Sequence, residues 1–162
     1  MSVRAWTLSI EDRERLIKEA FKAKEGSYSP YSKFPVGAAI LTADGTILRG
    51  ANIENASYGG TICAERTVLV KAVSEGIKKF VGLAVTTNVN SAISPCGMCR
   101  QFIREFCSND MPILLVPGDY PQTGEPKPGS RVSEGGVIET TLGELLPMSF
   151  GPEELELPRQ PQ

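Results

Sequence analysis

Three cysteines are placed where they could hold one metal ion. Cys63 stands at the start of one predicted helix, and Cys96 and Cys99 stand at the start of another. Residues three apart in a first helical turn face the same way, so two sulfur atoms can reach one ion. The partial positive charge of a helix N-terminus favours thiolate over thiol, and thiolate is the form that zinc binds. The sequence therefore predicts a zinc site with three sulfur ligands.

The fourth cysteine does not complete a closed site of four cysteines. Cys107 follows Cys99 by eight residues, and a rise of about 1.5 Å per residue carries it roughly 12 Å away along a continuous helix. Zinc–sulfur bonds of about 2.3 Å are too short for both sulfurs to share one tetrahedron. We interpret Cys107 as a buried apolar residue. Three ligands and one open position are typical of catalytic zinc.

Glu65 adds a base to this set. It follows Cys63 by two residues, so its carboxylate can stand beside the open position without being a ligand. The order Cys63-x-Glu65, then Pro95-Cys96-x-x-Cys99, matches the signature of the zinc deaminases, in which cysteine can be the first ligand. Cys-x-x-Cys alone is weak, because redox pairs and zinc ribbons also contain it. Together, at two helix starts, the two halves are specific.

The chain has 162 residues and no histidine. Ser-His-Asp and Cys-His machinery, two-histidine zinc proteases and imidazole pH switches are therefore excluded. Any transition metal must be held by sulfur or oxygen, and acid–base work falls to a carboxylate, cysteine, lysine or tyrosine. A formal net charge of −2, without a cluster of Lys and Arg, argues against a nucleic-acid partner.

We expect a cytoplasmic protein with no membrane partner. The first 20 residues contain no apolar core of signal-peptide length, and no stretch approaches the roughly 20 apolar residues of a membrane span. In a reducing compartment, a Cys-x-x-Cys pair favours metal binding or redox activity over a structural disulfide.

Hydrophobic periodicity and turn residues predict the elements that position these side chains. Ser9, with Asp12 three residues later, resembles a capping box, and Asp44-Gly45 predicts a hairpin turn. The predicted helices cover about residues 10–26, 63–75, 96–107 and 141–146, and the predicted strands about 36–43, 46–52, 80–87, 111–116 and 137–140. This alternation predicts a layered α/β domain in which helices cross back over the sheet.

Residues 117–136, the excursion, interrupt this pattern. They are rich in Pro, Gly and polar residues and have no apolar period, so we interpret them as a long loop. We expect a single domain over residues 1–150, with the excursion inside it, and a C-terminal tail over residues 151–162.

Four segments carry a resemblance to a known family. Between about Tyr28 and Leu155, the chain contains YSPYSKFPVGAAI, NIENASYGGTICAERTVL, SPCGMCRQF and LLPMSFGPEEL. With these it resembles the small homotetrameric cytidine deaminases of pyrimidine salvage, the branch whose first zinc ligand is Cys. The resemblance implies a three-layer α/β/α fold with a central mixed five-stranded sheet and one Zn²⁺ per chain. It also implies hydrolysis of cytidine and 2′-deoxycytidine to uridine and 2′-deoxyuridine, with release of ammonia.

The same resemblance implies roles at the metal site. Cys63, Cys96 and Cys99 are the implied zinc ligands. Glu65 is the implied proton shuttle, which takes a proton from water and delivers it to the ring N3. Three thiolates make an electron-rich site, so we expect Arg66 to withdraw charge from them by hydrogen bonding.

The resemblance also implies substrate contacts. They are Phe34, Asn52, Glu54, Ala56, Tyr58, Ala64 and Phe150. Phe34 would pack on the pyrimidine face, and Asn52 and Glu54 would hold the ribose 3′ hydroxyl. An amide and a carboxylate two residues apart at a strand end point the same way and can bracket a hydroxyl.

Some of these contacts imply shared active sites in a homotetramer. Ala56 and Tyr58 match positions that reach the sugar's 5′ side across a subunit boundary. Phe150 matches an aromatic residue that closes a neighbour's site.

Three other interpretations stay open. A deaminase of a nucleoside analogue or nucleoside antibiotic would share the metal motifs. A nucleic-acid editing deaminase is disfavoured by the charge balance. In a structural zinc or redox protein, Glu65, Asn52 and Glu54 would have no role.

Overall fold

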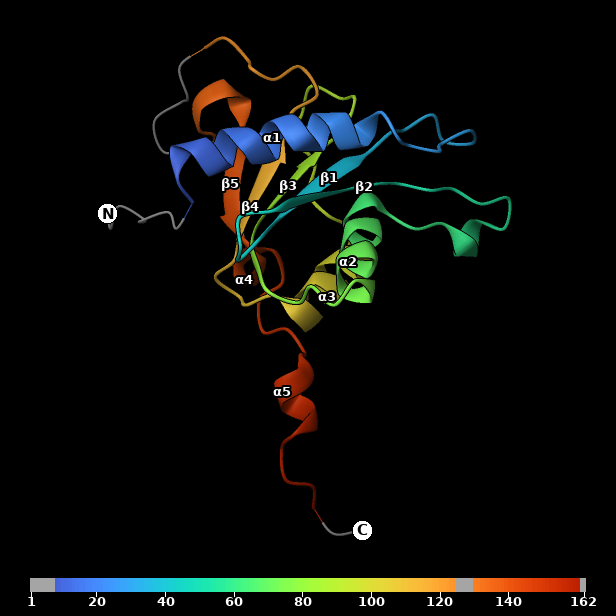
Figure 1. Cartoon of the computed structure of the whole chain (residues 1–162), viewed down its shortest axis with the longest axis vertical. Helices are drawn as coiled ribbons and strands as arrows, with labels where there is room; N and C mark the ends of the chain where they lie inside the picture. The colour runs from blue at the N-terminus through green and yellow to red at the C-terminus, as the bar shows by residue number, and fades with distance from the viewer. Residues whose placement is uncertain (1–7, 125–129, 161–162) are drawn as a thin grey trace.

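The structure is a computed structural model that describes residues 8–124 and 130–160. Within them, five strands form one sheet in the order β2-β1-β3-β4-β5 (Figure 1). The strands are β1 (Gly37–Thr42), β2 (Ile47–Ala51), β3 (Phe80–Thr86), β4 (Pro112–Val116) and β5 (Ile138–Thr141). The helices are α1 (Ile10–Lys24), α2 (Ala64–Ser74), α3 (Gly97–Phe106), α4 (Leu142–Leu145) and α5 (Pro152–Leu155). Because β3 and β4 are parallel and the other neighbours antiparallel, the sheet is mixed, which confirms the predicted class.

Local sequence signals begin and end these elements as expected. The Ser9 Oγ accepts a hydrogen bond from the backbone N–H of Asp12 at 3.0 Å and begins α1. The Asp12 carboxylate accepts from the Ser9 hydroxyl rather than from its backbone, so the reciprocal half of a capping box is replaced. Gly45 has φ +87° in the turn between β1 and β2, where a residue without Cβ is least strained.

The sheet is covered on both faces. One cluster of buried side chains packs α2 and α3 on the sheet and includes Leu69 and Ile103. A second cluster packs α1 on the sheet and includes Leu16 and Ile17. Neighbouring residues along the strands alternate between the two clusters, as residues on opposite faces do. The result is three layers, α/β/α.

Two glycines let helices from opposite faces contact the sheet backbone. A Cβ on Gly37 in β1 would lie 2.2 Å from the carbonyl oxygen of Ala20 in α1. A Cβ on Gly50 in β2 would lie 2.5 Å from the backbone nitrogen of Val68 in α2. At these positions the helices approach closer than any side chain allows.

The crossovers bring two helix N-termini together. Since β2 and β3 are both antiparallel to β1, they run in the same direction, and each is followed by a helix. The N-termini of α2 and α3 therefore lie at the carboxyl edge of the sheet, where open α/β sheets form their ligand crevices.

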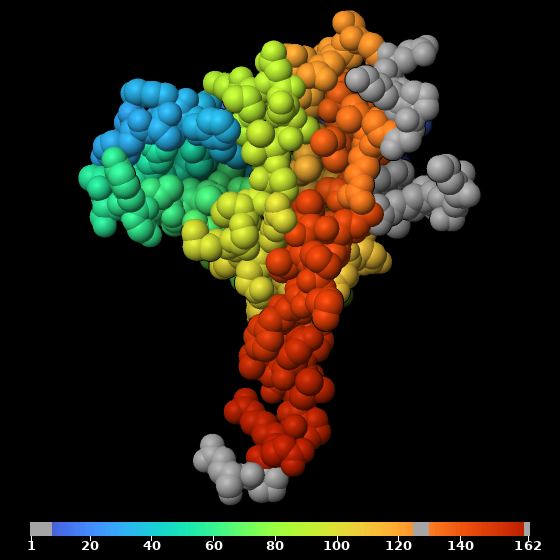
Figure 2. Space-filling view, turned by 180° about the vertical axis from the view of Figure 1, so that it is seen from behind, coloured from blue at the N-terminus to red at the C-terminus, as the bar shows by residue number. Residues whose placement is uncertain are grey.

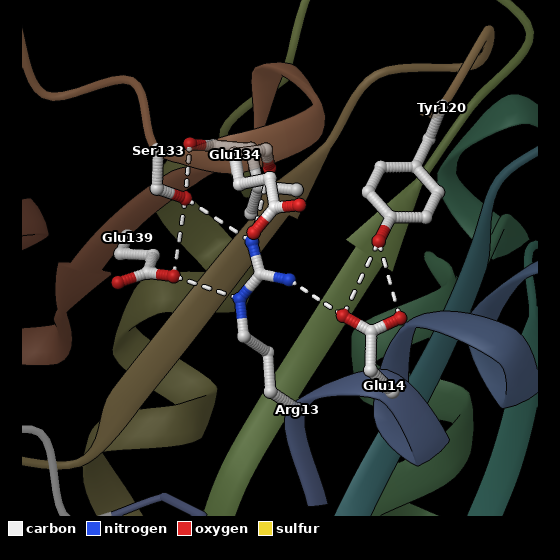
Figure 3. A network of polar contacts seen from close by, with 7 residues as sticks. Arg13, Glu14, Tyr120, Ser133, Glu134 and Glu139 are labelled. Carbon is white, nitrogen blue, oxygen red and sulfur yellow. Dashed lines mark hydrogen bonds and ion pairs between the residues drawn. The ribbon is translucent and has the colours of Figure 1, made fainter. Parts of the chain in front are cut away.

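The described parts of the excursion pack on α1 (Figure 3). Arg13 in α1 donates to Glu139 at 2.9 Å, to the Ser133 hydroxyl at 3.2 Å and to the Glu134 carbonyl at 3.1 Å. The Tyr120 hydroxyl donates to Glu14 at 3.2 Å. Because Arg13 is largely buried, these bonds fix the excursion against the helix.

The C-terminal residues leave the body of the domain as an arm that carries α5 (Figure 2). An ion pair between Arg104 in α3 and Glu153 in α5, 2.8 Å long, joins the arm to the body. Met148, Leu155 and Leu157 are exposed along it. No helix in the described part of the chain is both long and apolar enough to cross a membrane.

Candidate metal centre and substrate cavity

The three predicted sulfur ligands converge. The Sγ atoms of Cys63 and Cys96 are 3.9 Å apart, and those of Cys96 and Cys99 are 3.6 Å apart. All three lie within 4.8 Å of one another. Zinc–sulfur bonds of about 2.3 Å at tetrahedral angles put neighbouring sulfurs about 3.8 Å apart. The thiols therefore fit one zinc ion.

The two helix N-termini explain the convergence. Cys63 is the N-cap of α2, Cys96 is the N-cap of α3, and Cys99 lies in the first turn of α3. Neither N-cap sulfur is used to cap its helix, so both remain available to a metal. Among residues 8–124 and 130–160, no other three Cys, Asp or Glu side chains come close enough to share an ion. Cys107 lies in the apolar core, as predicted, where burial raises the pKa of its thiol to about 12.

The thiols of Cys63 and Cys99 differ in pKa. Hydrogen bonds from the Cys99 thiol and the Arg66 guanidinium lower the pKa of Cys63 to about 5. The pKa of Cys99 is raised, because its thiol donates to Cys63 and is buried. A pKa of about 5 keeps Cys63 in the thiolate form at neutral pH.

Arg66 lies where its expected role requires. Its Nη2 is 3.7 Å from the Cys63 Sγ and donates to the carbonyl oxygen of Thr61 at 3.2 Å. The hydrogen bond to Cys63 raises the pKa of Arg66, so the cation is held beside the thiolate. A guanidinium in this position withdraws charge from the sulfur.

Glu65 is the buried carboxylate beside the sulfurs. Its residue is 4% exposed and lies in the first turn of α2. Burial raises the pKa of Glu65 above its ordinary value, which favours the protonated form. This upward shift is in the direction required of a carboxyl group that takes up a proton and then delivers it.

A cavity of about 380 Å³ opens above this centre. The predicted site residues that line it are Phe34, Asn52, Glu54, Cys63, Glu65 and Cys96. Apolar walls with a few converging polar groups are typical of small-molecule sites. The structure therefore brings the implied base, two metal ligands and three implied substrate contacts around one space.

Other lining residues were not singled out from the sequence. They are Ser32, Val36, Thr61, Val85, Thr87, Ile93 and Ser94. Thr87, Ile93 and Ser94 belong to the segment that joins β3 to α3. Their position at the carboxyl end of a central strand was the available signal.

Asn52 organises the segment that carries Phe34. Its Oδ1 accepts from the Val36 backbone N–H at 2.8 Å and from the Ser27 hydroxyl at 2.6 Å. Its Nδ2 donates to the Phe34 carbonyl at 2.8 Å. The C=O and one N–H of the Asn52 amide therefore bond to the chain itself, and the second N–H can donate to a ligand.

Glu54 is held as an anion at the mouth of the cavity. Its carboxylate accepts from the Ser32 hydroxyl and from the backbone N–H of Tyr31 at 2.9 Å. These bonds, the one from Ser32 above all, lower the pKa of Glu54. The carboxylate therefore stays an acceptor at neutral pH.

The remaining predicted contacts do not line this cavity. Ala64 is buried between Cys63 and Glu65 in the sequence, and Ala56 is exposed. Tyr58 is 76% exposed and lines an adjacent space of about 300 Å³ together with Glu54. Phe150 is 57% exposed at the base of the arm, where its carbonyl accepts from Gln101 of α3 at 2.9 Å.

The fold and the cavity together are those of a metal-dependent hydrolase: three converging thiols can hold the metal, and the buried carboxyl group of Glu65 lies beside them. Residues 10–115 match the family described as "cytidine and deoxycytidylate deaminase zinc-binding region". The chain belongs to this family. It is 48% identical over 144 residues to the cytidine deaminase of Sporosarcina psychrophila, covering 89% of this chain and 95% of that protein.

Less similar proteins are also named cytidine deaminases. The cytidine deaminase of Mycobacterium tuberculosis is 37% identical over 149 residues, covering 92% of this chain and 97% of that protein. The crystal structure of a cytidine deaminase from Burkholderia pseudomallei superposes with a TM-score of 0.73 at 38% identity. It covers 85% of this chain and 98% of that one.

Proposed function

We propose that this protein catalyses the zinc-dependent hydrolytic deamination of cytidine and 2′-deoxycytidine. The observation that carries the proposal is that three converging sulfurs lie at one cavity, which Glu65 lines together with three of the implied nucleoside contacts, Phe34, Asn52 and Glu54. The names of the relatives support the same reaction. A purely structural zinc site would not place a buried carboxylate and an open cavity beside its sulfurs.

Cys63, Cys96 and Cys99 would hold Zn²⁺, which when bound supplies Lewis-acid activation of water. Glu65 takes a proton from the attacking water and delivers it to the ring N3 as the bond from oxygen to C4 forms. Glu65 then passes the second proton of that water to the amino group. The C4–N bond breaks, ammonia leaves, and the uridine product remains.

The other cavity residues bind and orient the nucleoside. Phe34 packs on the face of the pyrimidine ring, an interaction of about 1–3 kcal/mol by analogy with base stacking. The spare N–H of Asn52 donates to the sugar's 3′ hydroxyl, and the Glu54 carboxylate accepts from it. Ala64, whose side chain is buried, contributes backbone rather than side-chain contacts.

The cavity's charge favours free nucleosides over nucleotides. The family's name covers both cytidine and deoxycytidylate deaminases. Neither the main cavity nor the adjacent one has a Lys or Arg among its described lining residues, and Glu54 lies on both. Within one chain, a 5′ phosphate would find no cation among the described residues of either cavity, which disfavours it.

We also propose a homotetramer whose subunits complete one another's sites. Phe150, Ala56 and Tyr58 are exposed and do not line the chain's own main cavity, so a neighbouring subunit can contact them. For the location we propose the cytoplasm, because the three thiols must stay reduced to bind metal. Gel filtration tests the assembly, since a monomer mass would contradict it.

A spectrophotometric assay tests the activity. Cytidine should be converted to uridine by the wild-type protein, with 2′-deoxycytidine as a second substrate and deoxycytidylate as a poor one. Glu65→Gln should keep about one zinc per chain and lose roughly 10²–10⁴-fold in turnover. Glu75→Gln, at the exposed C-terminal end of the same helix, is the matched control. Near-normal turnover in Glu65→Gln would contradict the assignment of the base, and no turnover in the wild type would contradict the function.

A further inference from the structure

One wall of the cavity is held by residues outside the site. Residues 87–96 join β3 to α3, and Thr87, Ile93, Ser94 and Cys96 of this segment line the cavity. The segment forms no strand or helix, so its carbonyl groups need donors from elsewhere. Those donors determine where the wall stands.

Lys24 supplies the first donor. It is the last residue of α1, and its Nζ donates to the carbonyl oxygen of Thr87 at 3.0 Å. The same ammonium lies 4.7 Å from the centre of the Phe21 ring. The side chain is half-buried, and burial lowers the pKa of Lys24. A hydrogen bond from a charged donor is stronger than one between neutral groups.

The beginning of the excursion supplies two more donors. The backbone N–H of Gly118 donates to the Val89 carbonyl at 2.7 Å. The Nε2 of Gln122 donates to the Asn90 carbonyl, also at 2.7 Å. A Cβ on Gly118 would lie 2.7 Å from the Thr87 carbonyl oxygen, so only glycine allows this close packing.

These donors lie on α1 and on the excursion, and these two segments are bonded to each other. The bonds from Arg13 to Ser133 and Glu134 and from Tyr120 to Glu14 fix the excursion on α1 (Figure 3). The same helix ends at Lys24. Together, α1 and the excursion therefore hold residues 87–90 of the cavity wall in place.

The other end of the wall is held separately. Arg100 of α3 donates to the Pro95 carbonyl at 2.7 Å and to the Ser94 hydroxyl at 2.8 Å. Loosening residues 87–90 should therefore leave Cys96 in place beside the other sulfurs. Substrate binding is then affected, while the metal centre is kept.

We propose that Lys24 and Gln122 are positioning residues that set the cavity wall at residues 87–94 and thereby the affinity for the nucleoside. Neither residue lines the cavity. Without their hydrogen bonds, the wall samples more conformations, and substrate binding must order it. The kinetic consequence rests on the proposed function, whereas the ordering of the wall does not.

Steady-state kinetics on the zinc-loaded enzyme is the first test. Lys24→Met and Gln122→Ala should each raise KM for cytidine about three- to tenfold, the loss expected for one hydrogen bond, with kcat within about twofold of wild type. Zinc content should stay unchanged. Lys24→Arg, which can still donate to Thr87, should restore most of the loss. Lys22→Met is the control, since Lys22 is an exposed residue of the same helix that pairs with Glu19.

Hydrogen exchange is the second test, and it requires no activity. Peptides covering residues 87–94 should exchange about threefold faster or more in Lys24→Met and Gln122→Ala, and unchanged in Lys22→Met. Unchanged exchange in both variants, or unchanged KM with lower thermal stability alone, would overturn the proposal. If the wild-type protein does not deaminate cytidine, the proposed function fails and exchange alone decides the positioning. If Lys24→Met does not fold, Gln122→Ala is judged by the same criteria.

Discussion

Replacing Asn52 with alanine removes an amide that holds the segment bearing Phe34. The Asn52 side chain bonds Val36 at 2.8 Å, Ser27 at 2.6 Å and Phe34 at 2.8 Å, and the residue is 8% exposed. Three hydrogen bonds of about 1 kcal/mol each give a loss of about 3 kcal/mol in the free energy of unfolding. For a chain of this size, that loss lowers Tm by roughly 6–12 °C.

The same substitution should weaken substrate binding for two reasons. The N–H of Asn52 that would meet the sugar is lost, and Phe34 is no longer held in place. Two such losses of about 1–1.4 kcal/mol each raise KM roughly 30- to 100-fold. Because Glu65 and the sulfurs are held by other elements, kcat should fall less than KM rises.

Thermal unfolding at fixed protein concentration and excess zinc, with steady-state kinetics alongside, measures both effects. Asn55→Ala is the control, because Asn55 is exposed and its side chain accepts only from the nearby Ser57 backbone among the bonds described. Asn52→Asp keeps the acceptor oxygen Oδ1 but sets a second carboxylate oxygen against the Phe34 carbonyl. Asn52→Asp should therefore also raise KM. A Tm for Asn52→Ala within about 2 °C of wild type would refute the hydrogen-bond account, and an unchanged KM would remove Asn52 from the substrate site.

Three further substitutions test other parts of the molecule. Cys96→Ala should lose its zinc, measured by elemental analysis after dialysis, and a fully metallated, active variant would contradict the ligand set. Gly37→Ala sets a Cβ 2.2 Å from the Ala20 carbonyl oxygen and should destabilise the fold by about 3 kcal/mol in chemical denaturation; unchanged stability would show that α1 can move away. Phe150→Ala should raise KM about tenfold in an assembled tetramer, as loss of one aromatic contact does; an effect on stability alone would return Phe150 to a packing role.

Much of the fold follows from local signals in the sequence. The Ser9 cap, the Asp44-Gly45 turn and the apolar runs predicted the five strands and helices α1 to α4 to within about two residues of their observed ends. Helix α5 was not predicted, because residues 151–162 were expected to be a tail. The metal centre followed for the same reason, because its ligands sit at helix starts and helix starts have recognisable caps. The arithmetic of helical rise correctly separated Cys107 from the other three cysteines.

The remaining site residues depend on contacts between distant segments. Thr87 and Ile93 lie in a segment without periodicity, so only the folded sheet shows that they line the cavity. Lys24 contacts Thr87 across 63 positions of sequence, and a lysine at a helix end is otherwise read as a solvated cation that complements the helix dipole. The reciprocal part of the expected capping box also differed, because the shorter Asp12 side chain reaches the Ser9 hydroxyl instead of its backbone.

Gly37 and Gly50 have a consequence for the thermodynamics of binding. They lie on adjacent rungs of the β1–β2 pair, where α1 and α2 press on the backbone from opposite faces. The chain leaves this tightly packed region directly into Asn52 and Glu54. The backbone that carries Asn52 and Glu54 is therefore already ordered before substrate binds, so little conformational entropy is lost on binding. Affinity at the sugar end should then depend mainly on the hydrogen bonds themselves.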